Sequence, residues 1–155
     1  GGGWPVALTT LAFERNAMAL SLWVWARQAV DRLAAVAQAQ GLAGDEGVIE
    51  AIGQLDADAE AVRIGSIRAI SEVQQGTPPG AESSALKLQW AHVVQNATRL
   101  AFQLQGTESV LVDGSREREL LHRYLRARGH TIEGGTDEVQ KSILAERVLA
   151  LPRSR

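Results

Sequence analysis

Two adjacent glycines, Gly134 and Gly135, precede residues that favour the start of a helix. Glycine tolerates positive φ angles, so the backbone can turn tightly there. Thr136 or Asp137 can cap the helix that follows, and Asp137 with Gln140 has the spacing of a capping box. A glycine turn before a helix presents free N–H groups and partial positive charge. The stretch is typical of a site for a phosphate or polar cofactor group, although many helices also begin after two glycines.

Glu14 is the strongest candidate for acid–base chemistry. It follows Leu11 and precedes Met18 at spacings that place all three on one face of a helix. No lysine or arginine lies three or four residues away to neutralise it within that helix. A buried carboxylate without a partner is costly unless it serves a site. Glu14 is therefore either a functional carboxylate or an ordinary helix glutamate with a salt bridge across the fold.

Other residues with potential chemistry favour ordinary structural roles. Glu119 and His122 form a single Glu-x-x-His pattern, whereas di-iron bundles need two such patterns and further glutamates, so no metal site is predicted. A cluster of arginines is interleaved with glutamates, which argues against nucleic-acid binding. These arginines are Arg116, Arg118, Arg123, Arg126 and Arg128. The tryptophans are expected to pack in the fold or its interfaces; they are Trp4, Trp23, Trp25 and Trp90.

Composition favours one helical domain in the cytoplasm. The chain has 155 residues, 45% of them apolar, which suffices for one core. A net charge of −2 argues against nucleic acid, and the absence of cysteine excludes disulfides and thiolate metal sites. No apolar run reaches membrane-spanning length, and no secretion signal is visible. Because Trp4-Pro5 leads directly into a predicted helix, we expect the opening glycines to come from a loop of a larger protein.

Apolar residues recur at helical spacing and predict three long helices, at residues 6–40, 45–75 and about 83–105, the third capped by Ser83 or Ser84. Residues 106–115 are expected to be irregular, and a short charged helix should cover residues 116–128. The last helix should place Leu144, Val148 and Leu151 on one face and end at Pro152. The expected inner face of the first helix comprises Leu11, Met18, Leu22, Trp25, Ala29, Leu33 and Val36. Together these elements predict an all-α, up-down four-helix bundle with a short extra helix.

The residues from Gly134 to Gln140, followed by Ala145 to Leu149, closely resemble the C-terminal signature of the FAD-dependent acyl-CoA dehydrogenases. The resemblance covers essentially all 155 residues, as the C-terminal helical domain of that family. The family's N-terminal helical domain and middle β-domain are absent from this chain. The resemblance implies FAD as cofactor and acyl-CoA as substrate. It also implies α,β-dehydrogenation, in which a carboxylate removes the α-proton and the flavin accepts the β-hydride.

The resemblance also indicates the catalytic base. Some family members carry it in the first helix, in a Leu-x-x-Glu-Arg motif that residues 11–15 resemble, and most carry it just before the Gly-Thr of the signature. Gly134 occupies that second position and cannot act as a base. The resemblance therefore implies Glu14, with Glu133, one residue out of register, as the alternative. Arg15 would bind the acyl-CoA, or else be a solvated helix arginine.

Residues of the signature imply the flavin contacts. The signature positions are Gly134, Gly135, Thr136 and Glu138. Gln103 and Gly106 resemble a Gln-x-x-Gly element that reaches the flavin of a neighbouring subunit, although Gln103 can equally be a polar residue near a helix end.

One element of the family pattern is missing. Many relatives carry an Arg-x-x-Phe-Gly element after the first helix, where residues 37–42 read Ala-Gln-Ala-Gln-Gly-Leu. The family forms dimers and tetramers through this bundle, so a homo- or hetero-oligomer is expected. A non-catalytic partner subunit or oligomerisation module therefore remains the alternative to a catalytic subunit, and an unrelated ligand-binding bundle is a remoter one.

Overall fold

The structure, a computed structural model, describes residues 2–7, 9–10, 18–77, 80–109 and 115–152. All of the regular secondary structure in these residues is helical, which confirms the all-α prediction. The elements are α2 (Ala19–Ala39), α3 (Glu46–Gln74), α4 (Ser83–Gln105), η1 (Gly106–Ser109), α5 (Ser115–Ala127), η2 (Arg128–Thr131) and α6 (Asp137–Arg147). No helix in the described ranges is long and apolar enough to cross a membrane.

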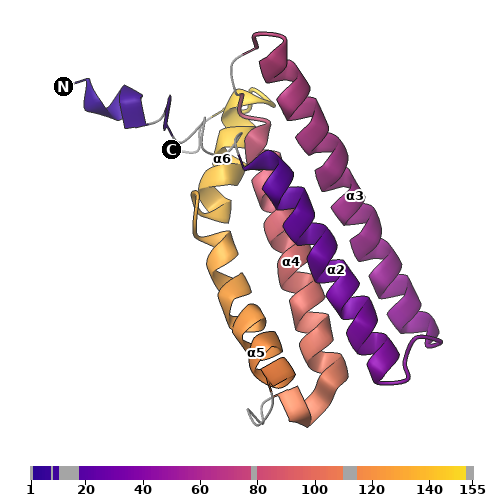
Figure 1. The fold of residues 1–155 in the computed structure, drawn as a ribbon. Helices are drawn as coiled ribbons and strands as arrows, with labels where there is room; N and C mark the ends of the chain where they lie inside the picture. Colours follow the sequence, from indigo (N-terminus) through magenta and orange to yellow (C-terminus); the bar gives the residue numbers. More distant parts are fainter. Residues whose placement is uncertain (1, 8, 11–17, 78–79, 110–114, 153–155) are drawn as a thin grey trace.

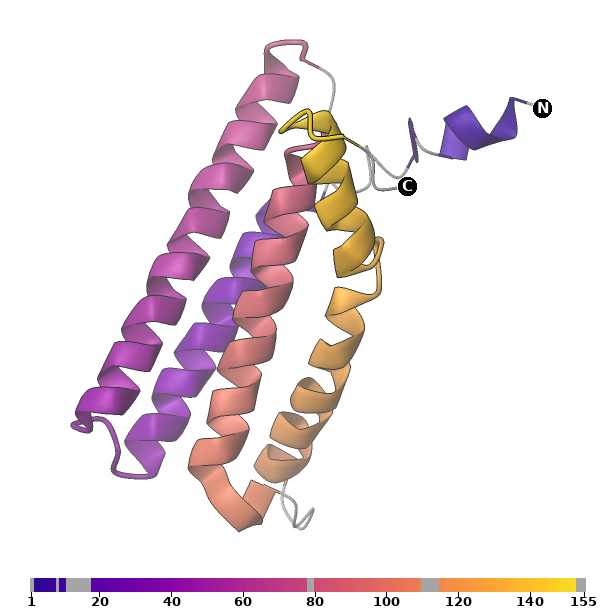
Figure 2. The same ribbon diagram turned by 180° about the vertical axis from the view of Figure 1, so that it is seen from behind.

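The predicted bounds agree with the structure for α3 and α4 and only in part elsewhere. The 3-10 helix η1 occupies part of the segment expected to be irregular, and η2, which follows α5, was not predicted. The predicted first helix is described in two parts, since residues 3–7 and 9–10 are helical and α2 begins at Ala19. The first part lies apart from the bundle in Figures 1 and 2, and Trp4 is 72% exposed.

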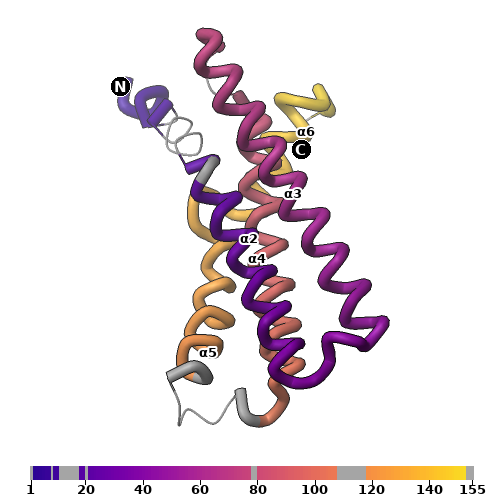
Figure 3. The backbone as a smooth tube through the Cα atoms, turned by 45° about the vertical axis from the view of Figure 1, so that its right-hand side comes forward, coloured from indigo at the N-terminus to yellow at the C-terminus, as the bar shows by residue number. Residues whose placement is uncertain are grey.

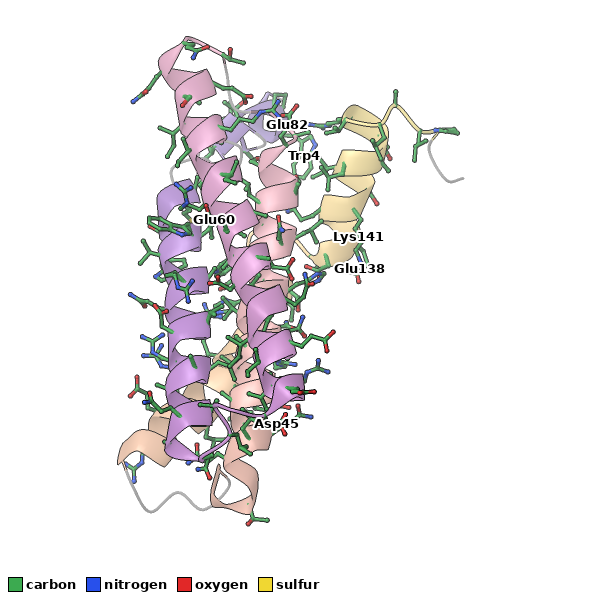
Figure 4. All side chains as sticks on the ribbon, turned by 90° about the vertical axis from the view of Figure 1, so that its right-hand side faces the viewer. Trp4, Asp45, Glu60, Glu82, Glu138 and Lys141 are labelled. Atoms are coloured by element: carbon green, nitrogen blue, oxygen red, sulfur yellow. The ribbon has the colours of Figure 1, made fainter. Side chains whose placement is uncertain are left out.

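Successive long helices run antiparallel, as the short connections after Gln40 and Gln75 predict (Figure 3). Asp45, before α3, and Glu82, before α4, lie at opposite ends of the bundle in Figure 4. The helix α4 is central, because it contacts α2, α3, α5 and α6. The fourth position of the bundle is filled by α5 and α6 in succession, whereas the sequence predicted α6 there and treated residues 116–128 as an extra helix (Figure 1).

The core lies where α2, α3 and α4 meet. Its most deeply buried side chains include Leu33, Val62 and Val93, all members of apolar helical faces. The prediction that Trp25 is buried on the inner face of α2 is wrong, because Trp25 is 42% exposed, although its ring faces Trp90 of α4 with centroids 5.7 Å apart. The fully buried face of α2 instead runs through small residues such as Ala26, which let α2 approach α4 closely.

The helix starts show one cap that was not predicted and correct another that was. Asp45 caps α3 and accepts a hydrogen bond from the backbone N–H of Val48 at 3.0 Å. The prediction that Ser83 or Ser84 caps α4 is wrong, because Glu82 is the N-cap residue and its side chain forms no capping bond. The Ser83 hydroxyl instead donates to the carbonyl of Gly80 at 2.9 Å.

The last helix ends earlier than predicted. It stops at Arg147, where the chain reverses through Ala150 at φ 52°. The N–H of Leu151 returns to the carbonyl of Ala145 at 2.8 Å, so the free carbonyls at this end are satisfied before Pro152 is reached. Val148 and Leu151 lie beyond this end and are exposed, so the prediction that they continue one face of the helix with Leu144 is wrong.

Candidate functional site

The predicted glycine turn lies between η2 and α6. Gly134 has φ +67° and Gly135 has φ +103°, angles that side-chain-bearing residues rarely adopt. A Cβ on Gly134 would have no heavy atom within 4 Å, whereas a Cβ on Gly135 would lie 2.4 Å from Nε2 of Gln140. The turn therefore presents bare backbone on one side and is packed against α6 on the other.

Thr136 caps α6, and the proposed capping box is absent. The Thr136 hydroxyl oxygen accepts from the backbone N–H of Val139 at 3.4 Å. Asp137 does not cap the helix, because its carboxylate points into the bundle toward α4. Gln140 is fully buried, and its Nε2 donates to the carbonyl of Gly134 at 2.7 Å. The capping-box prediction is thus wrong, and Gln140 instead joins the glycine turn to α6 by this hydrogen bond.

A buried ion pair joins α6 to α4 directly after the turn. Nζ of Lys87 lies 3.3 Å from Oδ1 of Asp137, and Nε2 of His92 lies 2.9 Å from Oδ2. Burial opposes the ionisation of Asp137, but its hydrogen bonds with His92 and Lys87 and their charge outweigh burial and lower its pKa. The sequence analysis missed Lys87, which is 4% exposed, although it precedes the buried Trp90 by three residues and so shares the inner face of α4.

Glu133, the alternative base, has both carboxylate oxygens bonded to neighbouring side chains. Its Oε2 lies 2.6 Å from Nη2 of Arg126 and its Oε1 lies 2.5 Å from Nδ1 of His130. Burial raises the pKa of Glu133, but the hydrogen bonds from Arg126 and His130 and their charges lower it more. A carboxylate with a lowered pKa and both oxygens engaged is a weak proton acceptor.

The structure separates the remaining predicted flavin contacts into two groups. Glu138 is exposed near the start of α6, with its pKa lowered by hydrogen bonds from its own N–H and from Thr136 (Figure 4). Gln103 is exposed in the last turn of α4, and Gly106, at φ +67°, donates its N–H to the Gln103 carbonyl. Since Asp137 contacts Lys87 and His92 in the first half of α4, these two groups lie toward opposite ends of that helix.

Glu14 and Arg15 lie outside the described residues. The nearest described residue that follows them is Met18, the N-cap residue of α2. Met18 and Glu133 both line a cavity of about 330 Å³, which α2, α4, α5 and η2 enclose. The first turn of α2 and the glycine turn are thereby brought to the same cavity, although their residues are more than a hundred positions apart in the sequence.

The surface candidates behave as ordinary helix residues. Glu119 pairs with Arg123 at 2.5 Å, and Arg128 lies over the Tyr124 ring at 4.9 Å from its centroid. Within the described ranges, no three histidine, aspartate or glutamate side chains are placed to share a metal ion.

The comparison with family models decides the identity. The model of the acyl-CoA dehydrogenase C-terminal domain matches residues 1–149. The chain belongs to the acyl-CoA dehydrogenase family. The fold is shared with a solved structure of the Tcur3481-Tcur3483 steroid ACAD G363A variant, which superimposes with a TM-score of 0.80 at 22% identity, over 99% of this chain and 41% of that one.

Curated relatives agree with the family assignment. Acyl-CoA dehydrogenase IpdE1 of Mycolicibacterium smegmatis is 33% identical over 99% of this chain, and IpdE1 of Mycobacterium tuberculosis is 32% identical over the same share. Acyl-CoA dehydrogenase FadE34 of M. tuberculosis is 30% identical over 97% of the chain. The chain spans 38% and 39% of the two IpdE1 proteins and 20% of FadE34.

The packing of Gly135 against Gln140 gives a first prediction. Gly135→Ala should lower the free energy of unfolding by about 1–3 kcal/mol, because alanine is strained at φ +103° and its Cβ would displace the Gln140 amide. Chemical denaturation of the purified chain measures this. Gly53→Ala, in open space on α3, is the matched control and should stabilise the chain by up to about 1 kcal/mol. Equal stability of wild type and Gly135→Ala would show that the turn is not packed as described.

Proposed function

We propose that this chain is the C-terminal domain of a flavin-dependent acyl-CoA dehydrogenase that introduces an α,β double bond into an acyl-CoA thioester. The observation that carries the proposal is the glycine turn at the start of α6, which Gln140 fastens to the helix and the Lys87–Asp137 ion pair fastens to α4. In a chain of this family, such a fixed turn is suited to hold a cofactor in one position relative to the helices of the bundle.

The residues at the turn fit the family's flavin. The side of Gly134 that a Cβ would occupy is open, so a planar or polar group can approach the backbone there. The N-terminal end of α6 adds partial positive charge beside Thr136 and Glu138. These residues with Gly135 would hold FAD, and Gln103 and Gly106, at the far end of α4, would serve the FAD of a neighbouring subunit. When bound, FAD would accept the hydride that leaves the β-carbon of the substrate.

Glu14 is the proposed catalytic base. Gly134 has no side chain, and Glu133 is engaged by Arg126 and His130 with a lowered pKa. These two observations favour the first-helix glutamate, which would remove the α-proton of the thioester within hydrogen-bond reach of the α-carbon. Arg15, next to it, would bind the acyl-CoA.

A second candidate function is a non-catalytic partner subunit in a mixed oligomer. It is favoured by Gly134, which replaces the base at one position, and by residues 37–42, which lack the Arg-x-x-Phe-Gly element. In that case the bundle would serve assembly, and the base would come from a partner subunit. The substitution of Glu14 considered in the Discussion distinguishes the two functions.

The chain alone should neither bind FAD with sub-micromolar affinity nor oxidise acyl-CoA. The reason is that it spans about two-fifths of the length of the IpdE1 relatives, and the family's other domains supply much of the pocket. Titration of FAD into the purified chain, followed by flavin fluorescence, measures this. The full-length protein, purified in parallel as the control, should retain FAD. Failure of the full-length protein to bind FAD would contradict the proposed function.

A further inference from the structure

The cavity between α2, α4 and α5 combines an apolar floor with hydrogen-bond donors. Val94, Ala97 and Ala101 of α4 form the floor, and the rings of Trp25 and Trp90, with centroids 5.7 Å apart, form part of one wall. Trp90 is 3% exposed, and its indole Nε1 has no hydrogen-bond partner among the described residues. Such a buried donor without an acceptor is costly, so Trp90 is held in place by the packing around its ring.

Two arginines line the cavity away from the glycine turn. Arg32 of α2 and Arg123 of α5 face each other closely enough that burial, and then the positive charge of Arg123, lower the pKa of Arg32. Arg123 is paired with Glu119, whereas the hydrogen bond of Arg32 is a weak one to the Gln28 amide oxygen at 3.3 Å. The nearby carboxylates Glu119 and Asp31 do not line the cavity, and Asp31 is paired with Arg27, so the lining itself is positively charged at this part of the cavity.

Free acceptors are scarce in the same cavity. Glu133 is the acidic residue among its described lining residues, and both of its oxygens are already bonded, to Arg126 and His130. The Thr98 hydroxyl donates to the carbonyl of Val94, so its oxygen is the free acceptor that remains among these two side chains. A cavity with an apolar floor, unused donors and few free acceptors is complementary to an apolar molecule that carries an acceptor.

The cavity runs along α2 from Met18, its N-cap residue, to Arg32. It is lined at one part by Met18, four residues after Glu14, and by Glu133, which adjoins the glycine turn. From Met18 to Arg32 the helix α2 advances by about 21 Å, at 1.5 Å for each residue. This length exceeds what the thioester carbonyl and its neighbouring carbons alone would need.

We propose that the cavity receives the acyl part of the substrate, and that Arg32 and Arg123 bind a carboxylate or ketone oxygen at the far end of that acyl part. This inference rests on the proposed function for the identity of the ligand as a thioester. The two tryptophan rings provide flat apolar surfaces beside the acyl body. A substrate with a plain hydrocarbon end would leave the guanidinium groups facing carbon, and those donors would lose their bonds to water.

The cavity chemistry can be tested on the chain itself with decanoate as the probe. Decanoate should shift the indole N–H resonance of Trp90, and Arg32→Met should weaken its binding about tenfold or more, the usual effect of losing one charge-assisted hydrogen bond. Arg32→Lys should retain part of the affinity because it retains the charge. Arg63→Met, on the exposed side of α3 where Arg63 pairs with Glu60, is the matched control and should bind as the wild type does.

Decyltrimethylammonium tests whether the sign of the charge matters, and it should bind more weakly than decanoate. The proposal is overturned if decanoate leaves Trp90 unshifted, if both amphiphiles bind alike, or if folded Arg32→Met binds decanoate as tightly as the wild type. Thermal unfolding of each variant shows whether it is folded.

The full-length enzyme then tests whether the ligand is the substrate's acyl group. The mono-thioester of dodecanedioic acid with CoA should have a kcat/KM about tenfold or more above that of dodecanoyl-CoA, and Arg32→Met should remove this preference. If both thioesters reduce the flavin equally well in wild type and variant, the inference fails while the proposed function stands. If neither thioester reduces the flavin although decanoate binds the chain, the proposed function fails and the assignment of the cavity to an acyl group fails with it.

Discussion

Flavin reduction by an acyl-CoA should slow by a factor on the order of 10² to 10⁴ when Glu14 is replaced by Gln in the full-length enzyme, the usual contribution of a general base. Glutamine keeps the size and hydrogen-bonding reach of the side chain but cannot accept the α-proton. Flavin content and substrate affinity should therefore change little. Anaerobic stopped-flow measurement of the flavin absorbance, with substrate binding followed separately, provides the rate and the affinity.

Glu133→Gln is the matched control for this substitution, and it should cost much less activity. Its carboxylate is ion-paired with Arg126 and His130, so its loss removes a local contact and leaves the base in place. If Glu133→Gln abolished flavin reduction and Glu14→Gln did not, the base would be at the glycine turn. If the wild-type protein also showed no flavin reduction, neither substitution could change the rate, and the chain would be a non-catalytic partner subunit.

Lys87→Met should lower the free energy of unfolding of the chain by about 3–5 kcal/mol. The substitution leaves the Asp137 carboxylate buried in the bundle with only the half-exposed His92 beside it. Replacing both partners, as Lys87→Met with Asp137→Leu, should restore most of the stability, because the apolar pair leaves no buried charge. Urea unfolding of the four proteins in this double-mutant cycle gives the coupling energy directly.

Arg63→Met is the control for this cycle, because Arg63 and Glu60 form an exposed pair on α3, and exposed ion pairs contribute little to stability. The pH dependence adds a second readout. Asp137 has a lowered pKa in the folded chain, so its contribution is present above its unfolded pKa of about 3.9 and is lost as pH falls through the folded value. The double variant should lose less stability than the wild type over that acidic range. A Lys87→Met protein as stable as the Arg63→Met control would contradict the buried pair.

The ion pair also explains how α6 keeps its place. The helix has few buried side chains of its own, Asp137 and Gln140 among its described residues, and both are polar. One binds α4 and the other binds the glycine turn, so α6 is positioned by directional contacts more than by apolar packing. This arrangement fixes the register of the turn against the bundle, which is what a cofactor contact at the turn requires.

Apolar spacing and turn residues were sufficient to predict most of the helices. Asp45 precedes the first residue of α3, and the loop after Gln75 separates the end of α3 from the start of α4. Both are local features of the sequence, and the helices begin and end near them. The spacing did not predict how α2 is rotated, because Trp25 and Ala26 are neighbours and both are apolar. Close approach of α2 to α4 selects the smaller side chain for the interface, and this choice depends on the partner helix.

The candidate site was predictable where its contacts are local. His130 precedes Glu133 by three residues, a spacing at which the two side chains can meet, so their pairing could have been inferred. The partner of Asp137 could not, because Lys87 lies fifty residues earlier and only the packing of α6 on α4 brings them together. The sequence left Thr136 and Asp137 open as caps of this helix, and the structure confirms Thr136, because Asp137 is engaged by α4. The cavity was likewise unpredictable, since its lining comes from four separate elements.

The most direct test of the proposed function is anaerobic mixing of the full-length, FAD-loaded enzyme with a saturated acyl-CoA. The proposal predicts bleaching of the oxidised flavin absorbance and formation of the 2,3-enoyl-CoA in an amount equal to the flavin reduced. A panel that includes plain and carboxylate-ended acyl thioesters of matched length covers both kinds of substrate considered above. A flavin that remains oxidised with every thioester, with no enoyl product, would contradict the assignment of this chain to a catalytic acyl-CoA dehydrogenase subunit.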